Sequence, residues 1–97
     1  MTTVAQMTMK TLQSFRARTG EALGAPLPAT TPEQVDAAAA AAGDAFAAWA
    51  ASSGEQRATL LRGLAAALES DREGLVALAD DETALGPVRL NGELDRT

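Results

Sequence analysis

The sequence contains no cysteine and no histidine among its 97 residues. Without cysteine the chain has no disulfide framework, no thiolate nucleophile and no thiolate metal ligand. Without histidine it lacks the commonest general base and the commonest metal ligand, so Ser-His and Cys-His catalytic sets are excluded. Because the missing disulfides fit a reducing compartment, we expect the protein in the cytoplasm.

Aromatic and lysine side chains are also scarce. The aromatics are Phe15, Phe46 and Trp49, and Lys10 is the only lysine. The net charge is −5 and no basic cluster is present, so binding to nucleic acid has no electrostatic basis. Alanine supplies much of the 46% hydrophobic content and buries little area, so the expected core is thin and independent folding is marginal.

Two segments, residues 1–11 and residues 37–51, are candidates for a signal peptide or a membrane span, and neither has the required pattern. Residues 1–11 have three methionines, no periodicity and no basic segment before an apolar run, which predicts a disordered leader rather than a signal peptide. Met1, Met7 and Met9 are alternative starts. The alanine block at residues 37–51 is interrupted by Asp44, so a half-buried helix is favoured over a membrane span.

Residues 12–29 have the pattern of a short β-hairpin. Residues 12–16 alternate weakly, and Gly20 follows as a residue that tolerates the positive φ of many turns. Residues 22–29 can be extended, but Pro26 and Pro28 each remove a ladder donor. This segment is therefore predicted as an edge strand or a polyproline-like connection.

Thr31 opens the strongest helix signal in the sequence. It can cap the helix, Pro32 suits the first helical position, and Gln34 stands where a capping box needs its partner. Apolar residues then recur at spacings of 4, 3, 4 and 3 on one narrow face: Val35, Ala39, Ala42, Phe46 and Trp49. Gly43 inside this helix predicts close approach of another backbone.

Two further capping boxes and a new apolar stripe predict the next helices. Ser53 pairs with Gln56 after the Ser-Ser-Gly break, and Ser70 pairs with Glu73, which predicts a break near residues 70–71. The stripe between them is Leu60, Leu61, Leu64 and Leu68. A third helix follows, and residues 88–97 begin another. We expect five residues among the most buried: Phe46, Trp49, Leu61, Leu64 and Leu68.

Asp80, Asp81 and Glu82 form an acidic run near a predicted helix end. Neighbouring residues on a helix do not face each other, so a solvated surface is favoured over a metal site. Arg57 and Glu82 project toward the apolar stripes. They are expected either to pair with each other or to extend to solvent.

The predicted fold is mainly α, with three or four helices after a short N-terminal β-hairpin. Four segments of the sequence carry more information than their hydrophobic pattern: "RTGEALGAPLPAT", "TPEQVDAAAAAAGDAFAAWAAS", "EQRATLLRGLAAALESDREGLVALADDET" and "LNGELDRT". From Arg16 to Thr97 the chain resembles the N-terminal portion of an NAD(P)-dependent aldehyde dehydrogenase. The branch it resembles most oxidises semialdehydes such as 2,5-dioxopentanoate (ketoglutarate semialdehyde).

This resemblance implies that residues 12–97 are the first part of the cofactor-binding domain of an α/β enzyme. The family's cysteine nucleophile, catalytic glutamate and glycine-bearing cofactor turn would come from later sequence. No catalytic, cofactor-binding or metal-binding residue is therefore assigned to this chain, which is expected to be inactive alone and to bind neither NAD nor NADP. Family members usually carry a glycine directly after the Glu-Thr pair. Here Ala84 follows and the glycine is Gly86, which predicts a shifted or longer turn.

The partners implied are the remainder of the dehydrogenase chain and, for full-length relatives, further copies of the enzyme. Two alternatives remain open. The chain can be a free-standing helical module whose apolar stripes bind a partner, without catalytic activity. It can also be a degenerate product with no role.

Overall fold

The computed structural model describes residues 10–97. Its elements are two strands, β1 (Thr11–Phe15) and β2 (Ala22–Pro28), followed by four helices. The helices are α2 (Pro32–Ala51), α3 (Gly54–Ser70), α4 (Arg72–Thr83) and α5 (Pro87–Arg96). The predicted fold class, mainly helical with an N-terminal hairpin, is confirmed.

Residues 1–9 of the predicted leader lie outside the described residues. Its last two positions are structured, which corrects the predicted boundary. Thr11 is the first residue of β1, and the Lys10 carbonyl accepts a hydrogen bond of 2.9 Å from the Ala29 amide. The hairpin ladder therefore begins before Leu12.

The hairpin is antiparallel and irregular at its centre. Thr11 lies opposite Pro28 and Phe15 opposite Ala22, with a shift in register between Leu12 and Ser14. At this shift Gly24 adopts a φ of 74°, which a glycine takes without a steric cost. The Gln13 side-chain amide donates to the Leu23 and Gly24 carbonyls at 3.3 and 3.1 Å, so it replaces part of the interrupted ladder.

Two of the three predicted capping boxes form. Gln34 N donates to Thr31 Oγ1 at 3.1 Å while Thr31 N donates to Gln34 Oε1 at 2.8 Å, and Ser53 with Gln56 makes the same pair of bonds at the start of α3. The third box is wrong. The Ser70 hydroxyl donates back to the Ala67 carbonyl at 2.8 Å, because Ser70 is still the last residue of α3. Asp71 is the N-cap of α4 and makes no side-chain cap bond.

The turn between α4 and α5 spans Ala84, Leu85 and Gly86. Helix α4 ends at Thr83, and Ala84 itself adopts the left-handed conformation, with φ 58° and ψ 26°. Gly86 follows with φ 91° and precedes Pro87 at the first position of α5. Alanine thus occupies a backbone conformation that favours glycine.

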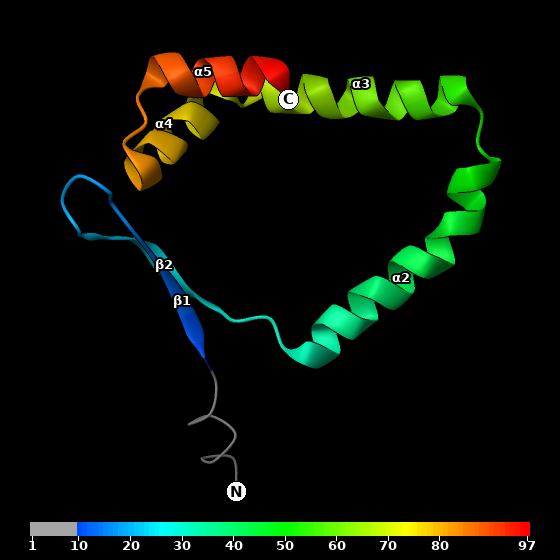
Figure 1. Cartoon of the computed structure of the whole chain (residues 1–97), viewed down its shortest axis with the longest axis horizontal. Helices are drawn as coiled ribbons and strands as arrows, with labels where there is room; N and C mark the ends of the chain where they lie inside the picture. Colours follow the sequence, from blue (N-terminus) through cyan, green and yellow to red (C-terminus); the bar gives the residue numbers. More distant parts are fainter. Residues whose placement is uncertain (1–9) are drawn as a thin grey trace, which may run out of the picture.

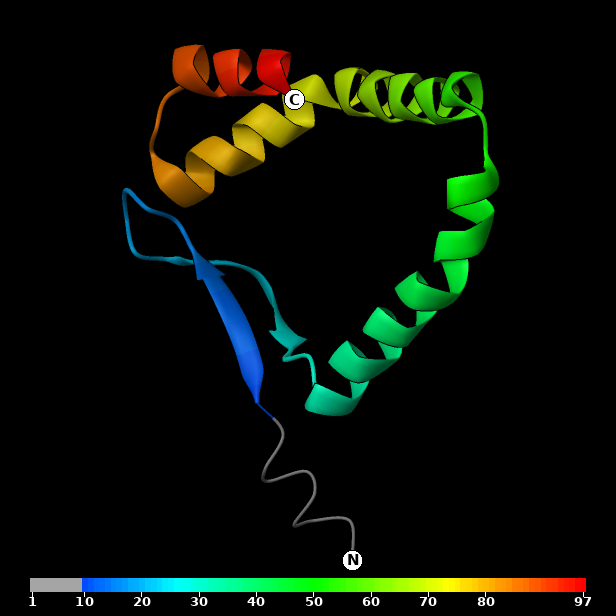
Figure 2. The same cartoon turned by 45° about the vertical axis from the view of Figure 1, so that its right-hand side comes forward.

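The elements run around an open ring (Figures 1 and 2): β2 leads into the start of α2, and the end of α4 returns beside the turn of the hairpin. Contacts between elements are concentrated within the hairpin, between α4 and α5, and between α4 and β1. The radius of gyration is 18.7 Å, whereas a compact chain of this length has one of about 12.5 Å. Residues 10–97 therefore do not form two packed layers with a core between them.

None of the described residues is buried, so the predicted core is wrong for this chain. Phe46 is 69% exposed, Trp49 43%, Leu61 61% and Leu64 54%, and Leu68 is half-buried. The stripes form as predicted, but a helical stripe becomes a core only when a second layer covers it. Nothing lies within 4 Å of the position a Cβ would take on Gly43, so the close approach expected there is not made within the chain.

Candidate functional site

Helix α4 is joined to the hairpin by two arginine–aspartate pairs, and we call this group the hairpin clamp. Arg18 donates through Nη1 and Nη2 to the two carboxylate oxygens of Asp80, each at 3.0 Å. Arg16 Nη1 lies 2.8 Å from Asp81 Oδ2. The Ala17 amide between the two arginines donates to the Asp81 carbonyl at 2.8 Å. The turn that follows β1 is therefore bound to the C-terminal end of α4 by both side-chain and backbone contacts.

The clamp corrects the prediction that the acidic run is a solvated face. Two consecutive aspartates on a helix project about 100° apart, which lets Asp80 and Asp81 each take a different arginine. Glu82 remains exposed. Among residues 10–97 no group of three or more acidic side chains is arranged so that it could hold a metal ion.

Asp80 also fixes the turn that follows α4. Its Oδ1 accepts a hydrogen bond of 2.9 Å from the Gly86 amide. Hydrogen bonding to Arg18, and then to the Gly86 amide, lowers the pKa of Asp80 from its usual range, although partial desolvation opposes this shift. The same pairing raises the pKa of Arg18. Asp80 is thus the residue on which the hairpin, α4 and the α4–α5 turn converge.

Arg72, at the first position of α4, forms a second polar group that we call the Arg72 hub. Its guanidinium binds Glu69 at the end of α3, the Asn91 side-chain oxygen at 3.0 Å and the Asp95 carboxylate at 2.6 Å. Hydrogen bonds to Glu69 and then Asp95 raise the pKa of Arg72. One planar side chain with several donors therefore links three helices.

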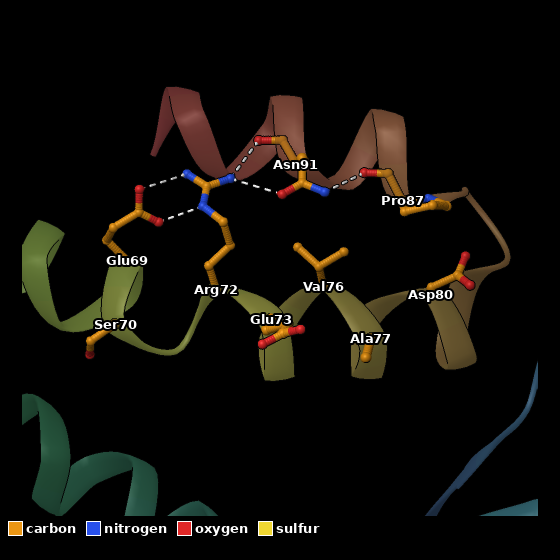
Figure 3. A pocket seen from close by; sticks show the side chains of 9 residues that line it. All are labelled: Glu69, Ser70, Arg72, Glu73, Val76, Ala77, Asp80, Pro87 and Asn91. Carbon is orange, nitrogen blue, oxygen red and sulfur yellow. Dashed lines mark hydrogen bonds and ion pairs between the residues drawn. The ribbon is translucent and has the colours of Figure 1, made fainter.

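The Arg72 hub lies at one end of an open groove between α4 and α5 (Figure 3). The groove has a volume of about 610 Å³ and is lined by Glu69, Ser70, Arg72, Glu73, Val76, Ala77, Asp80, Pro87 and Asn91. Its one hydroxyl belongs to Ser70, which is bonded to the helix backbone as described above. Arg72 joins α4 to Glu69 and Asn91 across the groove, and the side chains that line it form no nucleophile–base pair. The groove is a structural junction.

Arg57 does not pair with Glu82. Its Nη1 donates to the Ser52 carbonyl at 2.5 Å and lies 3.4 Å from the Ser52 hydroxyl. Arg57 therefore covers the break between α2 and α3, where the last turn of α2 leaves backbone acceptors free. The predicted pairing is therefore wrong: Glu82 is exposed to solvent, as the other alternative expected, whereas Arg57 is half-buried and bonded to Ser52.

The residues that shape this structure are those that sequence reasoning left unassigned. Arg16 and Arg18 stand two positions apart at the end of an extended segment, and Asp80 and Asp81 follow each other on a helix. Two closely spaced arginines and two adjacent aspartates were the one sequence feature that could have indicated these ion pairs. The sequence offered no indication of which acidic residues, 62 positions away, would receive them.

A comparison with protein-family models covers nearly the whole chain and shows its family. The model of the aldehyde dehydrogenase family matches residues 4–96. The chain belongs to the aldehyde dehydrogenase family. This family consists of oxidoreductases, and its members generally use NAD(P). No solved structure matches the chain significantly.

The hairpin clamp and the Arg72 hub connect elements, and each polar group in them is already bonded to protein. Between Lys10 and Thr97 no helix has the length and apolar character that crossing a membrane requires.

Proposed function

We propose that this chain is the N-terminal part of an NAD(P)-dependent aldehyde dehydrogenase and supports its cofactor-binding domain without contributing a reacting group. In this proposal the remainder of the enzyme covers the apolar faces of α2 and α3 and brings the cysteine, the catalytic glutamate and the cofactor turn. The observation that carries the proposal is the combination of a family match over residues 4–96 with two exposed apolar stripes.

The chemistry of the family explains why the remainder is needed. A cysteine thiolate attacks the aldehyde carbonyl, because a thiolate is both a good nucleophile and a good leaving group. NAD(P), when bound, accepts the hydride, and a water activated by a glutamate then hydrolyses the thioester. This chain holds no cysteine and no glycine-rich turn of the G-x-G-x-x-G type that would hold a pyrophosphate.

The proposal extends to substrate, assembly and location. The likeness of the segments after Thr31 to the 2,5-dioxopentanoate branch supports a semialdehyde as substrate. The complete enzyme is proposed to form homo-oligomers in the cytoplasm, independent of nucleic acid and of membranes. The net charge of −5 and the lack of cysteine support these last points.

An activity comparison tests the proposal. The 97-residue chain and a version extended in frame with the downstream coding sequence are assayed for NAD(P)H formation with a panel of semialdehydes and simple aldehydes. Cofactor binding is measured by calorimetry. We expect turnover and binding in the extended protein only. An extended protein that folds, contains a cysteine and stays inactive would leave the alternative, a helical interaction module whose exposed stripes bind a partner.

A further inference from the structure

Helix α5 contains the only asparagine of the sequence, Asn91, and Gly92 follows it directly. Asn-Gly pairs are typical of tight turns, and both residues are weak helix formers. The helix also begins at Gly86, which has no side chain to cap the first turn. The helical conformation of Asn91 and Gly92 therefore depends on contacts that this helix makes with the rest of the structure.

An Asn-Gly pair has a chemical reactivity of its own, which requires only water. The backbone nitrogen of the glycine attacks Cγ of the asparagine side chain, and the new C–N bond closes a succinimide ring. The side-chain nitrogen takes the proton of the glycine nitrogen and leaves as ammonia. Water then opens the ring at one of its carbonyl groups, and the product is aspartate or isoaspartate. Glycine favours the attack because it has no Cβ and its backbone turns freely toward the side chain.

Both polar atoms of the Asn91 side chain are bonded to protein (Figure 3). Arg72 Nη1 donates to the Asn91 side-chain oxygen at 3.0 Å and to the Asn91 main-chain carbonyl at 3.3 Å. Asn91 Nδ2 donates to the Pro87 carbonyl at 2.8 Å. Asn91 is also half-buried. Its side-chain amide is therefore fixed between the start of α4 and the first turn of α5.

Helix geometry keeps the two reacting atoms apart. The Asn91 side chain runs back along α5 to the carbonyl of Pro87, as helical side chains lean toward the N-terminus. The amide nitrogen of Gly92 lies on the C-terminal side of Asn91, and in an α-helix its N–H is used in the hydrogen bond to the fourth residue before it. Ring closure brings Asn91 Cγ onto this nitrogen, so α5 has to open at this point before the reaction begins.

Within residues 10–97 neither packing nor backbone conformation requires a glycine at position 92. No atom lies within 4 Å of a Cβ built on Gly92, and Gly92 is not among the glycines with a positive φ. An alanine therefore fits there without displacing a neighbour. The reactivity of the pair can be removed while the helix is kept.

We propose that Asn91-Gly92 is a site of spontaneous deamidation that the Arg72 hub controls: the pair is stable while α5 is held on α4, and it reacts when α5 is released. The site consists of residues of α4 and α5 alone. It is therefore independent of the proposed function and of the sequence beyond the described residues.

The reaction makes the release of α5 permanent. The carboxylate of the product has no N–H to donate to the Pro87 carbonyl. It also brings a further negative charge to a guanidinium that already binds Glu69 and Asp95. In the isoaspartate product the main chain gains a methylene group, which moves every later residue out of the helical repeat. The deamidated fraction therefore measures how often α5 has been released.

The test compares deamidation at residue 91 in the folded protein and in the same protein kept in denaturant, both at mildly alkaline pH. Trypsin cleaves after Arg89 and Arg96, so residues 90–96 form one peptide in which Asn91 is the only asparagine. Mass spectrometry measures the conversion of Asn91 to aspartate, and chromatography separates the isoaspartate product. The reaction should be about ten-fold slower or more in the folded protein, because α5 has to open first.

Three variants separate the role of the hub from general effects. Arg72→Lys should accelerate the reaction in the folded protein about five-fold, the factor that the loss of one hydrogen bond gives, and leave the rate in denaturant unchanged. Arg89→Lys is the matched control, because Arg89 lies outside the hub, 3.7 Å from Glu93 on the same helix, and lysine keeps the tryptic cleavage site. Its rates should equal those of the natural protein. Gly92→Ala should lose most of the reaction in both conditions, because the added methyl group hinders the attack.

Any of three results would overturn the proposal. These are equal rates in the folded and the denatured natural protein, equal rates in Arg72→Lys and Arg89→Lys, or no reaction at residue 91 in denaturant. Far-UV circular dichroism establishes that each variant remains helical. If Arg72→Lys loses its helical signal, Asp95→Asn takes its place, because it removes one partner of Arg72 and leaves Asn91 and Gly92 unchanged. It should accelerate the reaction about two-fold, and a rate equal to that of Arg89→Lys would refute the control by the hub.

Discussion

Replacing Ala84 by glycine should stabilise the end of α4. Ala84 has φ 58° and ψ 26°, and its amide donates to the Asp80 carbonyl at 2.8 Å, which closes the last turn of the helix. In this left-handed region the alanine Cβ crowds the following carbonyl, at a cost of about 1–2 kcal/mol. Glycine removes that cost. It also gives the unfolded chain more freedom, which offsets about 0.4–1 kcal/mol.

The net effect is a gain of roughly 0.5–1 kcal/mol from Ala84→Gly. Ala77→Gly is the matched control, because Ala77 is an exposed residue in the middle of the same helix. There the same chemical change places glycine in ordinary helical geometry and costs about 1 kcal/mol. Identical substitutions seven residues apart should therefore act in opposite directions.

Amide hydrogen exchange along α4 measures both effects without requiring the whole chain to unfold as one unit. The protection of the amides in the last two turns should rise about two- to five-fold in Ala84→Gly, since 1.4 kcal/mol corresponds to a factor of ten. It should fall about five-fold in Ala77→Gly. Loss of protection in both variants would show that Ala84 carries no backbone strain and that the assignment of its conformation is wrong.

Three further outcomes test the caps, the hairpin clamp and the Arg72 hub. Thr31→Ala should lower the stability of the first turn of α2 by about 1 kcal/mol, while Ser70→Ala, at a residue that caps nothing, should have little effect; hydrogen exchange at the helix starts distinguishes them. Asp80→Asn should increase exchange of the Ala17 amide. In the natural chain the protection of the Ala17 amide, relative to an unfolded peptide at the same pH, should fall on acidification. The pKa of Asp80 is lowered in the folded chain, so the stability that Asp80 contributes is complete above its usual pKa of 3.8. That stability is lost as the pH falls through the lowered pKa. Arg72→Lys should increase exchange in α5, since a lysine cannot bind Glu69, Asn91 and Asp95 together; unchanged exchange would contradict the hub.

Local signals in the sequence determined the elements and their ends. The capping boxes at Thr31 and Ser53, the break near Ser70 and the turn at Gly20 each depend on residues within four positions of one another. Such interactions are decided by backbone geometry over a single turn and need no knowledge of the rest of the fold. The box expected at Ser70 failed because Ser70 is still the last residue of α3 and Asp71 takes the N-cap position of α4, a difference of one residue that is within the usual uncertainty of helix ends.

Composition determined equally well what the described chain does not supply chemically. A chain without cysteine and histidine cannot build a thiolate nucleophile or a Ser-His pair, whatever its fold. The order of its segments carried the family resemblance, and the family match over residues 4–96 confirmed it. Substrate, cofactor preference and location stay predictions.

Tertiary structure alone decided which charges meet and which apolar faces are covered. Arg18 and Asp80 are 62 positions apart, and their pairing depends on the path of α2, α3 and α4 around the ring. Burial of Phe46, Trp49 and Leu61 was expected from their spacing, yet spacing only places side chains on one face. Whether that face becomes a core depends on a second layer, and within residues 10–97 the chain folds none against it.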